Sequence, residues 1–236
     1  MTVWPWPAEL ELSEASLALQ AAQQRYQAAI QRVPAASPTS EPRDGQPTRL
    51  DTMEAAVSYL LGAFGVDEGD HTADTPRRVA KAWAHMLSGY REDPAEHLQR
   101  TFSAPPGPGP VVVSGVRLAS TCAHHLLPFT GTATVAYQPA PGKQIVGLSK
   151  LSRVVHGYSR RLQVQERIGA QVADAVNAAL APTWVVVLIS AVHQCMTLRG
   201  VEDTGAVTMT RTIRGGLIPD ADLAMVLAAH HAAGTK

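Results

Sequence analysis

Cysteine is scarce in this chain, which contains only two Cys among its 236 residues. Two cysteines are too few for the disulfide framework that stabilises small secreted domains. Residues 1–7 also lack the charged and then apolar pattern of a secretory signal. We therefore expect a reduced, cytoplasmic protein.

Long apolar runs and an excess of charge are absent as well. Apolar runs such as residues 184–191 are much shorter than the roughly 20 residues that a membrane helix needs. The formal net charge is zero, so no long-range field attracts nucleic acid or an anionic membrane surface. The hydrophobic content of 45% and the charged content of 17% are typical of a globular enzyme or binding protein.

The pattern of apolar residues predicts an N-terminal extension followed by one main domain. Residues 13–31 favour a helix, and residues 33–47 are rich in Pro, Ser and Gly, as linkers are. We interpret residues 1–50 as this extension, mobile or packed against a neighbouring subunit, and residues 51–236 as the domain. Within it, Asp51 is expected to cap the first helix.

Helical and strand patterns then alternate along the domain. In chain order we expect helices from 51 and from 75, strands at 111–118 and 130–137, a long helix or two from 149, strands at 184–189 and 205–213, and a helix at 220–231. This order predicts an α+β fold of antiparallel hairpins with helices on one face. His230 and His231 are interpreted as a solvated pair.

Both cysteines lie beside histidines, which suggests one shared metal site. Cys122 and His125 are close enough in sequence for a tight turn to aim both at one ion, and the distant Cys195 completes a set of three. Thiolate and imidazole are ligands that zinc prefers, and three protein ligands leave a fourth position open, as in catalytic zinc sites. Two buried cysteines of an ordinary core remain the alternative.

Two further histidines are candidates for proton transfer. His193 would share a strand face with Cys195 if both lie on a strand, and His124 adjoins His125. Histidine exchanges protons in the working range of most enzymes.

Charged and amide side chains form a second group of candidates. Ser149 begins a helix that also carries Lys150 and Arg153, which suggests an anion site, although a helix cap with surface charges is an equal alternative. Gln165 and Glu166 place an amide beside a carboxylate that could pair with the N–H edge of guanine; a solvated helix face would also explain them.

Taken together, these fragments resemble the GTP cyclohydrolase I family. The matching motifs are residues 74–81 (DTPRRVAK), 122–125 (CAHH), 147–153 (GLSKLSR), 163–167 (QVQER) and 193–195 (HQC), running on to 199–201 (RGV). They follow the family's order and cover roughly residues 50–216, whereas the N-terminal extension has no counterpart.

The resemblance implies a tunnelling fold (T-fold), with a four-stranded antiparallel sheet and helices packed on one face. It also implies a homodecamer whose active sites lie at subunit interfaces. The family uses Zn²⁺, which Cys122, His125 and Cys195 would hold. Its reaction hydrates GTP at C8, releases formate and closes a pterin ring, forming 7,8-dihydroneopterin triphosphate.

The resemblance also implies roles for the remaining candidates. Glu166 and Gln165 would recognise guanine, and His124 and His193 would move protons. The residues that would hold the triphosphate and ribose are Ser149, Lys150, Arg153, Arg199 and, from a neighbouring subunit, Arg78.

Ala123 departs from the family pattern, which usually has glutamate at this position. Alanine cannot accept a hydrogen bond or orient a neighbour, so that carboxylate's function is missing. Two alternatives to the complete reaction follow: an altered or truncated purine-nucleotide cyclohydrolase, and a non-catalytic nucleotide- or pterin-binding oligomer with structural zinc.

Overall fold

The computed structural model describes Gln24 and residues 48–66, 69 and 71–234. The helix expected over residues 13–31 therefore lies outside the described residues, apart from Gln24. The chain divides into two units, the first ending at His85 and the second beginning at Met86. In the described part of the chain, no helix is both long and apolar enough to cross a bilayer.

The first unit contains the helices α2 (Arg49–Ala63) and α3 (Thr75–Met86). Thr48, not Asp51, is the N-cap of α2: the Thr48 hydroxyl accepts from the Asp51 N–H at 3.2 Å, and the Asp51 carboxylate accepts from the Thr48 N–H at 2.8 Å. This reciprocal capping box satisfies two backbone donors at the helix start. Helix α3 begins at Thr75, as predicted, and has Pro76 in its first turn, where a proline is well tolerated.

The second unit is built on a five-stranded sheet in the order β5-β2-β3-β6-β7. Its strands are β2 (Val111–Cys122), β3 (Pro128–Gln138), β5 (Leu162–Gln163), β6 (Trp184–His193) and β7 (Thr208–Gly215). The four long strands pair antiparallel, as predicted. The short β5, which sequence reasoning missed, pairs parallel with the end of β2.

Shorter elements complete the second unit. They are the 3₁₀ helices η1 (Ser88–Arg91) and η2 (Pro94–Leu98), the strand pair β1 (Thr101–Ser103) and β4 (Gln144–Val146), and the helix α6 (Gln194–Thr197). Three longer helices, α4 (Leu148–Ser159), α5 (Gln165–Leu180) and α7 (Asp220–Gly234), pack against the sheet.

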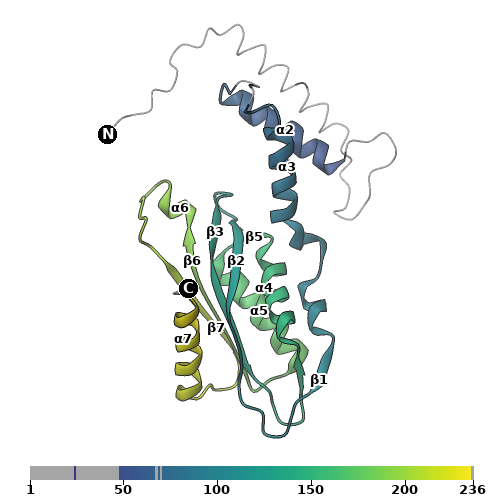
Figure 1. Cartoon of the computed structure of the whole chain (residues 1–236), viewed down its shortest axis with the longest axis vertical. Coiled ribbons are helices and arrows are strands. Elements are labelled where there is room, and N and C mark those ends of the chain that lie inside the picture. The colour runs from purple at the N-terminus through teal and green to yellow at the C-terminus, as the bar shows by residue number, and fades with distance from the viewer. Residues whose placement is uncertain (1–23, 25–47, 67–68, 70, 235–236) are drawn as a thin grey trace. The chain divides into compact units, whose positions relative to one another are not determined.

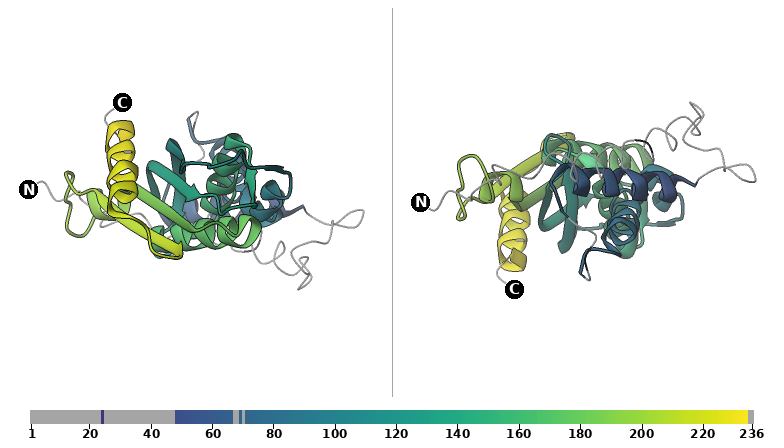
Figure 2. Two further views of the ribbon diagram at one scale, coloured as in Figure 1. Left: turned by 90° about the horizontal axis from the view of Figure 1, so that it is seen from below. Right: turned by 90° about the horizontal axis from the view of Figure 1, so that it is seen from above.

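The helices lie on both faces of the sheet, not on one as expected. Val187 and Ile189 of β6 belong to the core that includes residues of α4 and α5, whereas Trp184 and Val186 pack with Val226 of α7. Because neighbouring strand residues point to opposite faces, α7 covers the face opposite α4 and α5. Figures 1 and 2 show α7 on the far side of the sheet from these helices.

His230 of α7 is buried, which corrects the expectation of a solvated pair. Its side chain is 2% exposed and lies between two hydroxyls, with Thr134 Oγ1 2.9 Å from Nδ1 and Ser190 Oγ 2.8 Å from Nε2. Thr134 and Ser190 stand on neighbouring strands, so this histidine joins α7 to both. His231 is exposed, as expected.

The burial of His230 predicts a pH-dependent stability. Burial, and then the neighbouring His231, lower the pKa of His230 below its ordinary value of 6.5. The unfolded chain therefore binds this proton more readily, so the stabilisation is complete above pH 6.5 and is lost as the pH falls. Urea unfolding at pH 8 and pH 5 should show a larger loss of unfolding free energy in the parent than in His230→Gln. His231→Gln should lose less than the parent, because one cause of the lowered pKa of His230 is removed, but more than His230→Gln, because burial remains. Equal losses in all three proteins would contradict the prediction.

Candidate metal and substrate site

The turn between β2 and β3 brings two of the predicted ligands together. Cys122 ends β2, and the turn is closed by two backbone hydrogen bonds, from Cys122 N–H to Leu127 O at 2.8 Å and from Leu126 N–H to Cys122 O at 2.9 Å. Leu126 adopts a left-handed backbone with φ 58°, which a non-glycine residue rarely does. This tight turn holds His125 near Cys122.

The pairing of β3 with β6 brings in the third predicted ligand. Phe129, just after the turn, is paired with His193 at the end of β6, and α6 begins at the next residue. Cys195 therefore lies on a helical turn, not on a strand beside His193 as considered above. Figure 1 shows the β2–β3 turn and α6 at the same end of the sheet.

Close packing of β3 against β6 helps to hold this register. Gly131 is paired with Ala191, and a Cβ atom at Gly131 would collide with the carbonyl oxygen of Ser190. Only glycine permits this approach of the two backbones.

Cys122, His125 and Cys195 form a group that could hold a metal ion. Their three donor atoms lie within 4.8 Å of one another, with Cys122 buried, Cys195 half-buried and His125 exposed. Tetrahedral zinc with ligands at about 2.0–2.3 Å separates its donor atoms by about 3.3–3.8 Å, so small side-chain movements would complete the site. Two sulfurs and one imidazole nitrogen suit zinc and leave one position open.

The environment of Cys195 shows why a cation fits this group. Burial, and then the neighbouring Cys122, raise the pKa of the Cys195 thiol, whereas Arg199 acts in the opposite direction. Two thiolates so close together repel each other, and a bound cation removes that cost. Arg199 also reaches the group directly, with Nη1 3.1 Å from Nε2 of His125.

His193 stands beside the metal group in a defined environment. Its ring stacks on Phe129 with centroids 4.5 Å apart and an angle of 5°, and its Nε2 lies 2.9 Å from Oε1 of Gln165. Burial lowers the pKa of His193, and the Glu166 carboxylate acts in the opposite direction. The neutral ring that burial favours can accept a proton.

Of the other predicted site residues on the second unit, Gln165 is buried, Lys150 is half-buried and the rest are exposed. His124 is exposed and meets His125 edge to face at 6.2 Å between ring centroids. Ser149, Lys150 and Arg153 lie in the first two turns of α4, whose N-terminus has no side-chain cap. Its backbone N–H groups can therefore serve an anion.

Arg78 belongs to the first unit and carries an ion pair there. Asp74 contacts Arg77 at 3.0 Å and Arg78 at 3.1 Å. Arg77, more than Arg78, lowers the pKa of the Asp74 carboxyl. The Arg78 side chain is 72% exposed, so it remains accessible to a ligand despite this pair.

Sequence reasoning missed two features of the site. One is the stacking of Phe129 on His193, which depends on the β3–β6 register. The other is the set of partners of Gln165, a residue only 1% exposed whose amide nitrogen contacts Ile189, Thr208 and Thr210. No local pattern signals either one, because the partners are distant in sequence.

Comparisons with known proteins agree with the family resemblance that the sequence motifs indicated. The model of the family described as GTP cyclohydrolase I matches residues 53–231. A protein named GTP cyclohydrolase 1 from Carboxydothermus hydrogenoformans is 46% identical over 166 residues, covering 70% of this chain and 85% of the relative. Its namesake from Bacillus cytotoxicus is 47% identical over 173 residues, covering 73% and 90%.

A solved structure, described as an apo archaeosine synthase QueF-Like, is also similar. It is 19% identical, covers 48% of this chain and 99% of its own, and has a TM-score of 0.39, which is too low to establish a shared fold.

Proposed function

The chain belongs to the GTP cyclohydrolase I family and catalyses the hydrolytic cyclisation of GTP, and we propose that zinc held by Cys122, His125 and Cys195 serves this reaction. The convergence of these three donors from two distant segments is the observation that supports the metal most strongly. Zinc bound there would act as a Lewis acid and lower the pKa of a water molecule toward about 7. We further propose that the product is 7,8-dihydroneopterin triphosphate, with release of formate.

The protein side chains bind the substrate and move its protons. Addition of water across the C8–N7 bond of the purine takes one proton from the water and delivers one to N7. His193, stacked on Phe129, exchanges one of these protons, and His124, beside the metal group, exchanges the other. Glu166 accepts hydrogen bonds from the N–H edge of guanine. Its electrostatic effect on His193 supports this placement, because it means that the carboxylate lies near that ring.

The triphosphate is held by groups that carry or attract charge. The uncapped N-terminus of α4 presents Ser149, with Lys150 and Arg153 on the same helix, and Arg199 lies beside the metal group. Charge-assisted contacts to phosphate oxygens fix the end of the substrate that does not react. Arg78 would add a further contact from a neighbouring subunit.

The assembly and the cellular location follow from the same proposal. We propose a T-fold homodecamer with active sites between subunits, as the family resemblance implies. The two free cysteines support a reducing cytoplasm, because thiols that bind zinc must stay reduced.

Ala123 keeps the truncated reaction as a second candidate. Its N–H donates to the carbonyl oxygen of Gln163 at 2.9 Å, so this backbone position is held without any carboxylate. Restoring glutamate at Ala123 should raise the rate of ring closure if the missing carboxylate limits that step.

Anaerobic turnover of GTP tests both candidates. Protein with one zinc per chain should release formate and form a product that becomes fluorescent on oxidation and has the mass of dihydroneopterin triphosphate. A product that has lost formate but has not closed the pterin ring would favour the truncated reaction, particularly if Ala123→Glu completes it. Binding of GTP without any product at full metal occupancy would contradict both.

A further inference from the structure

Gln165 is buried at the first position of α5, and its side-chain amide is surrounded by partners. The amide nitrogen lies 3.0 Å from the carbonyl oxygen of Ile189, 3.1 Å from that of Thr208 and 3.1 Å from the hydroxyl of Thr210. The amide oxygen lies 2.9 Å from Nε2 of His193. With 1% of the residue exposed, these contacts take place away from solvent.

These partners determine which way the amide faces. Two of the three groups around the nitrogen are backbone carbonyls, which can only accept hydrogen bonds. Turning the amide over would place its oxygen against both of them, where acceptor faces acceptor, and would remove the donor that each receives from Gln165. The amide nitrogen must therefore face the carbonyl oxygens of Ile189 in β6 and Thr208 in β7, and the amide oxygen must face the ring of His193.

The orientation of the amide in turn determines where His193 carries its hydrogen. An amide oxygen only accepts, so the atom 2.9 Å away, Nε2 of His193, must donate. In a neutral imidazole the other nitrogen, Nδ1, then carries the lone pair. The stack on Phe129, with an angle of 5° between the rings, holds the plane of the ring as well.

We propose that Gln165 is a positioning residue that holds His193 as the Nε2–H tautomer, so that Nδ1 is the atom that exchanges protons with the substrate. The inference rests on the proposed proton-transfer role of His193. It assigns Gln165 to the support of that histidine and leaves guanine recognition to Glu166. Gln165 then acts on the chemical step and not on the affinity for GTP.

Neutron diffraction from crystals of the perdeuterated, metal-loaded protein at pH 8.5 tests the tautomer directly. We expect deuterium on Nε2 of His193, none on Nδ1, and both deuterons of the Gln165 amide directed toward Ile189, Thr208 and Thr210. Deuterium on Nδ1 alone, or a reversed amide, would overturn the inference. Because this measurement uses the parent protein without turnover, its result is independent of whether GTP is the substrate.

Substitution tests the consequence for the reaction. Gln165→Met keeps the length of the side chain but removes the acceptor for His193, so kcat should fall about 10–100-fold while KM for GTP stays within about twofold. Gln171→Met makes the same change on the same helix, where Gln171 bonds Gln163 and not His193, and should keep the parent kcat.

The two substitutions give distinguishable failures. A raised KM with kcat unchanged in Gln165→Met would show that Gln165 binds the base, which overturns the inference but not the proposed function. Absence of GTP turnover in the parent would instead contradict the proposed function. If Gln165→Met does not fold, the neutron structure of the parent still decides the tautomer.

Discussion

Replacing Cys195 with alanine is expected to abolish tight zinc binding and to lower GTP turnover by about 10³-fold or more. Cys195 supplies one of the three donor atoms that lie within 4.8 Å of one another, and the two that remain come from a single turn. Two protein ligands bind zinc with a much lower affinity than three, so the metal is lost when the protein is diluted or dialysed. The loss of the Lewis acid then removes several kcal/mol of transition-state stabilisation.

Metal analysis after dialysis and thermal unfolding measure this effect without turnover. Zinc at 100 times its dissociation constant should stabilise the parent by about 2.7 kcal/mol, and Cys195→Ala should show no such shift. Leu198→Ala is the matched control, because Leu198 closes the same short helix with a side chain that is 67% exposed. A Cys195→Ala protein that retains one zinc per chain would contradict the proposed ligand set.

Replacing Glu166 with glutamine is expected to lower kcat/KM for GTP by about 10²-fold. Glu166 is exposed in the first turn of α5, next to Gln165 and near His193. A carboxylate accepts hydrogen bonds from two N–H groups of guanine, whereas a glutamine amide offers one acceptor and places a donor against the other. The substitution therefore removes both charge and complementarity.

Comparison of GTP with inosine triphosphate separates base recognition from other effects. Inosine lacks the exocyclic amino group, so the parent should prefer GTP and Glu166→Gln should lose most of that preference. Any effect of Glu166 on the pKa of His193 applies to both substrates and cancels in the ratio. Glu96→Gln, at an exposed position of η2, should keep the parent's preference. An unchanged preference in Glu166→Gln would assign guanine recognition to other groups.

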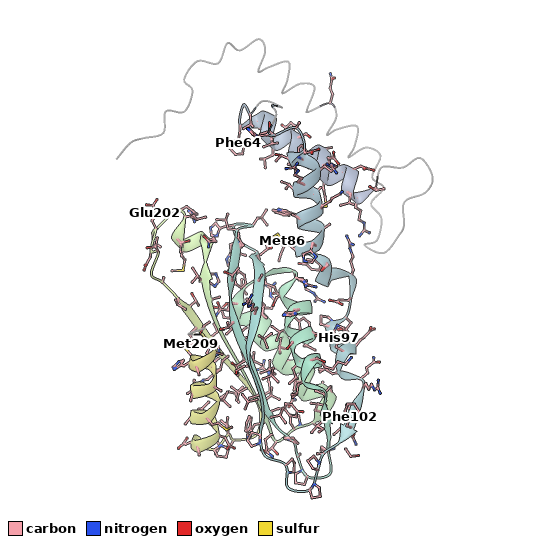
Figure 3. All side chains as sticks on the ribbon, viewed as in Figure 1. Phe64, Met86, His97, Phe102, Glu202 and Met209 are labelled. Carbon is pink, nitrogen blue, oxygen red and sulfur yellow. The ribbon has the colours of Figure 1, made fainter. Side chains whose placement is uncertain are left out.

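The loop after α6 shows how the metal group borders on solvent. Figure 3 labels Glu202 in this loop, where the backbone is left-handed with φ 53°, and the Asp203 N–H returns to Met196 at 3.0 Å. Arg199 lies between Met196 and Glu202 in the sequence, and its side chain is exposed. It can therefore leave His125 for a phosphate group without disturbing buried contacts.

The local elements were predictable from sequence because their signals are local. Pro76 in a first helical turn, the β-branched run from Trp184 and the apolar spacing of α5 each act within a few residues. The three residues of the possible metal group were also proposed this way, since the only two cysteines stand beside histidines, and the structure brings their donor atoms together. The capping of α2 by Thr48 instead of Asp51 shows the limit of such signals, because either residue type can cap.

The sequence by itself determined the order of helices and strands, the α+β class and the chemical nature of the donor group. Only the tertiary structure decided that α7 lies on the opposite face with His230 buried, that Phe129 stacks on His193, and that Gln165 is enclosed by β6 and β7. Each of these depends on the register between strands distant in sequence. Since a shift of one residue would turn every side chain to the other face, such contacts exist only once the whole sheet has formed.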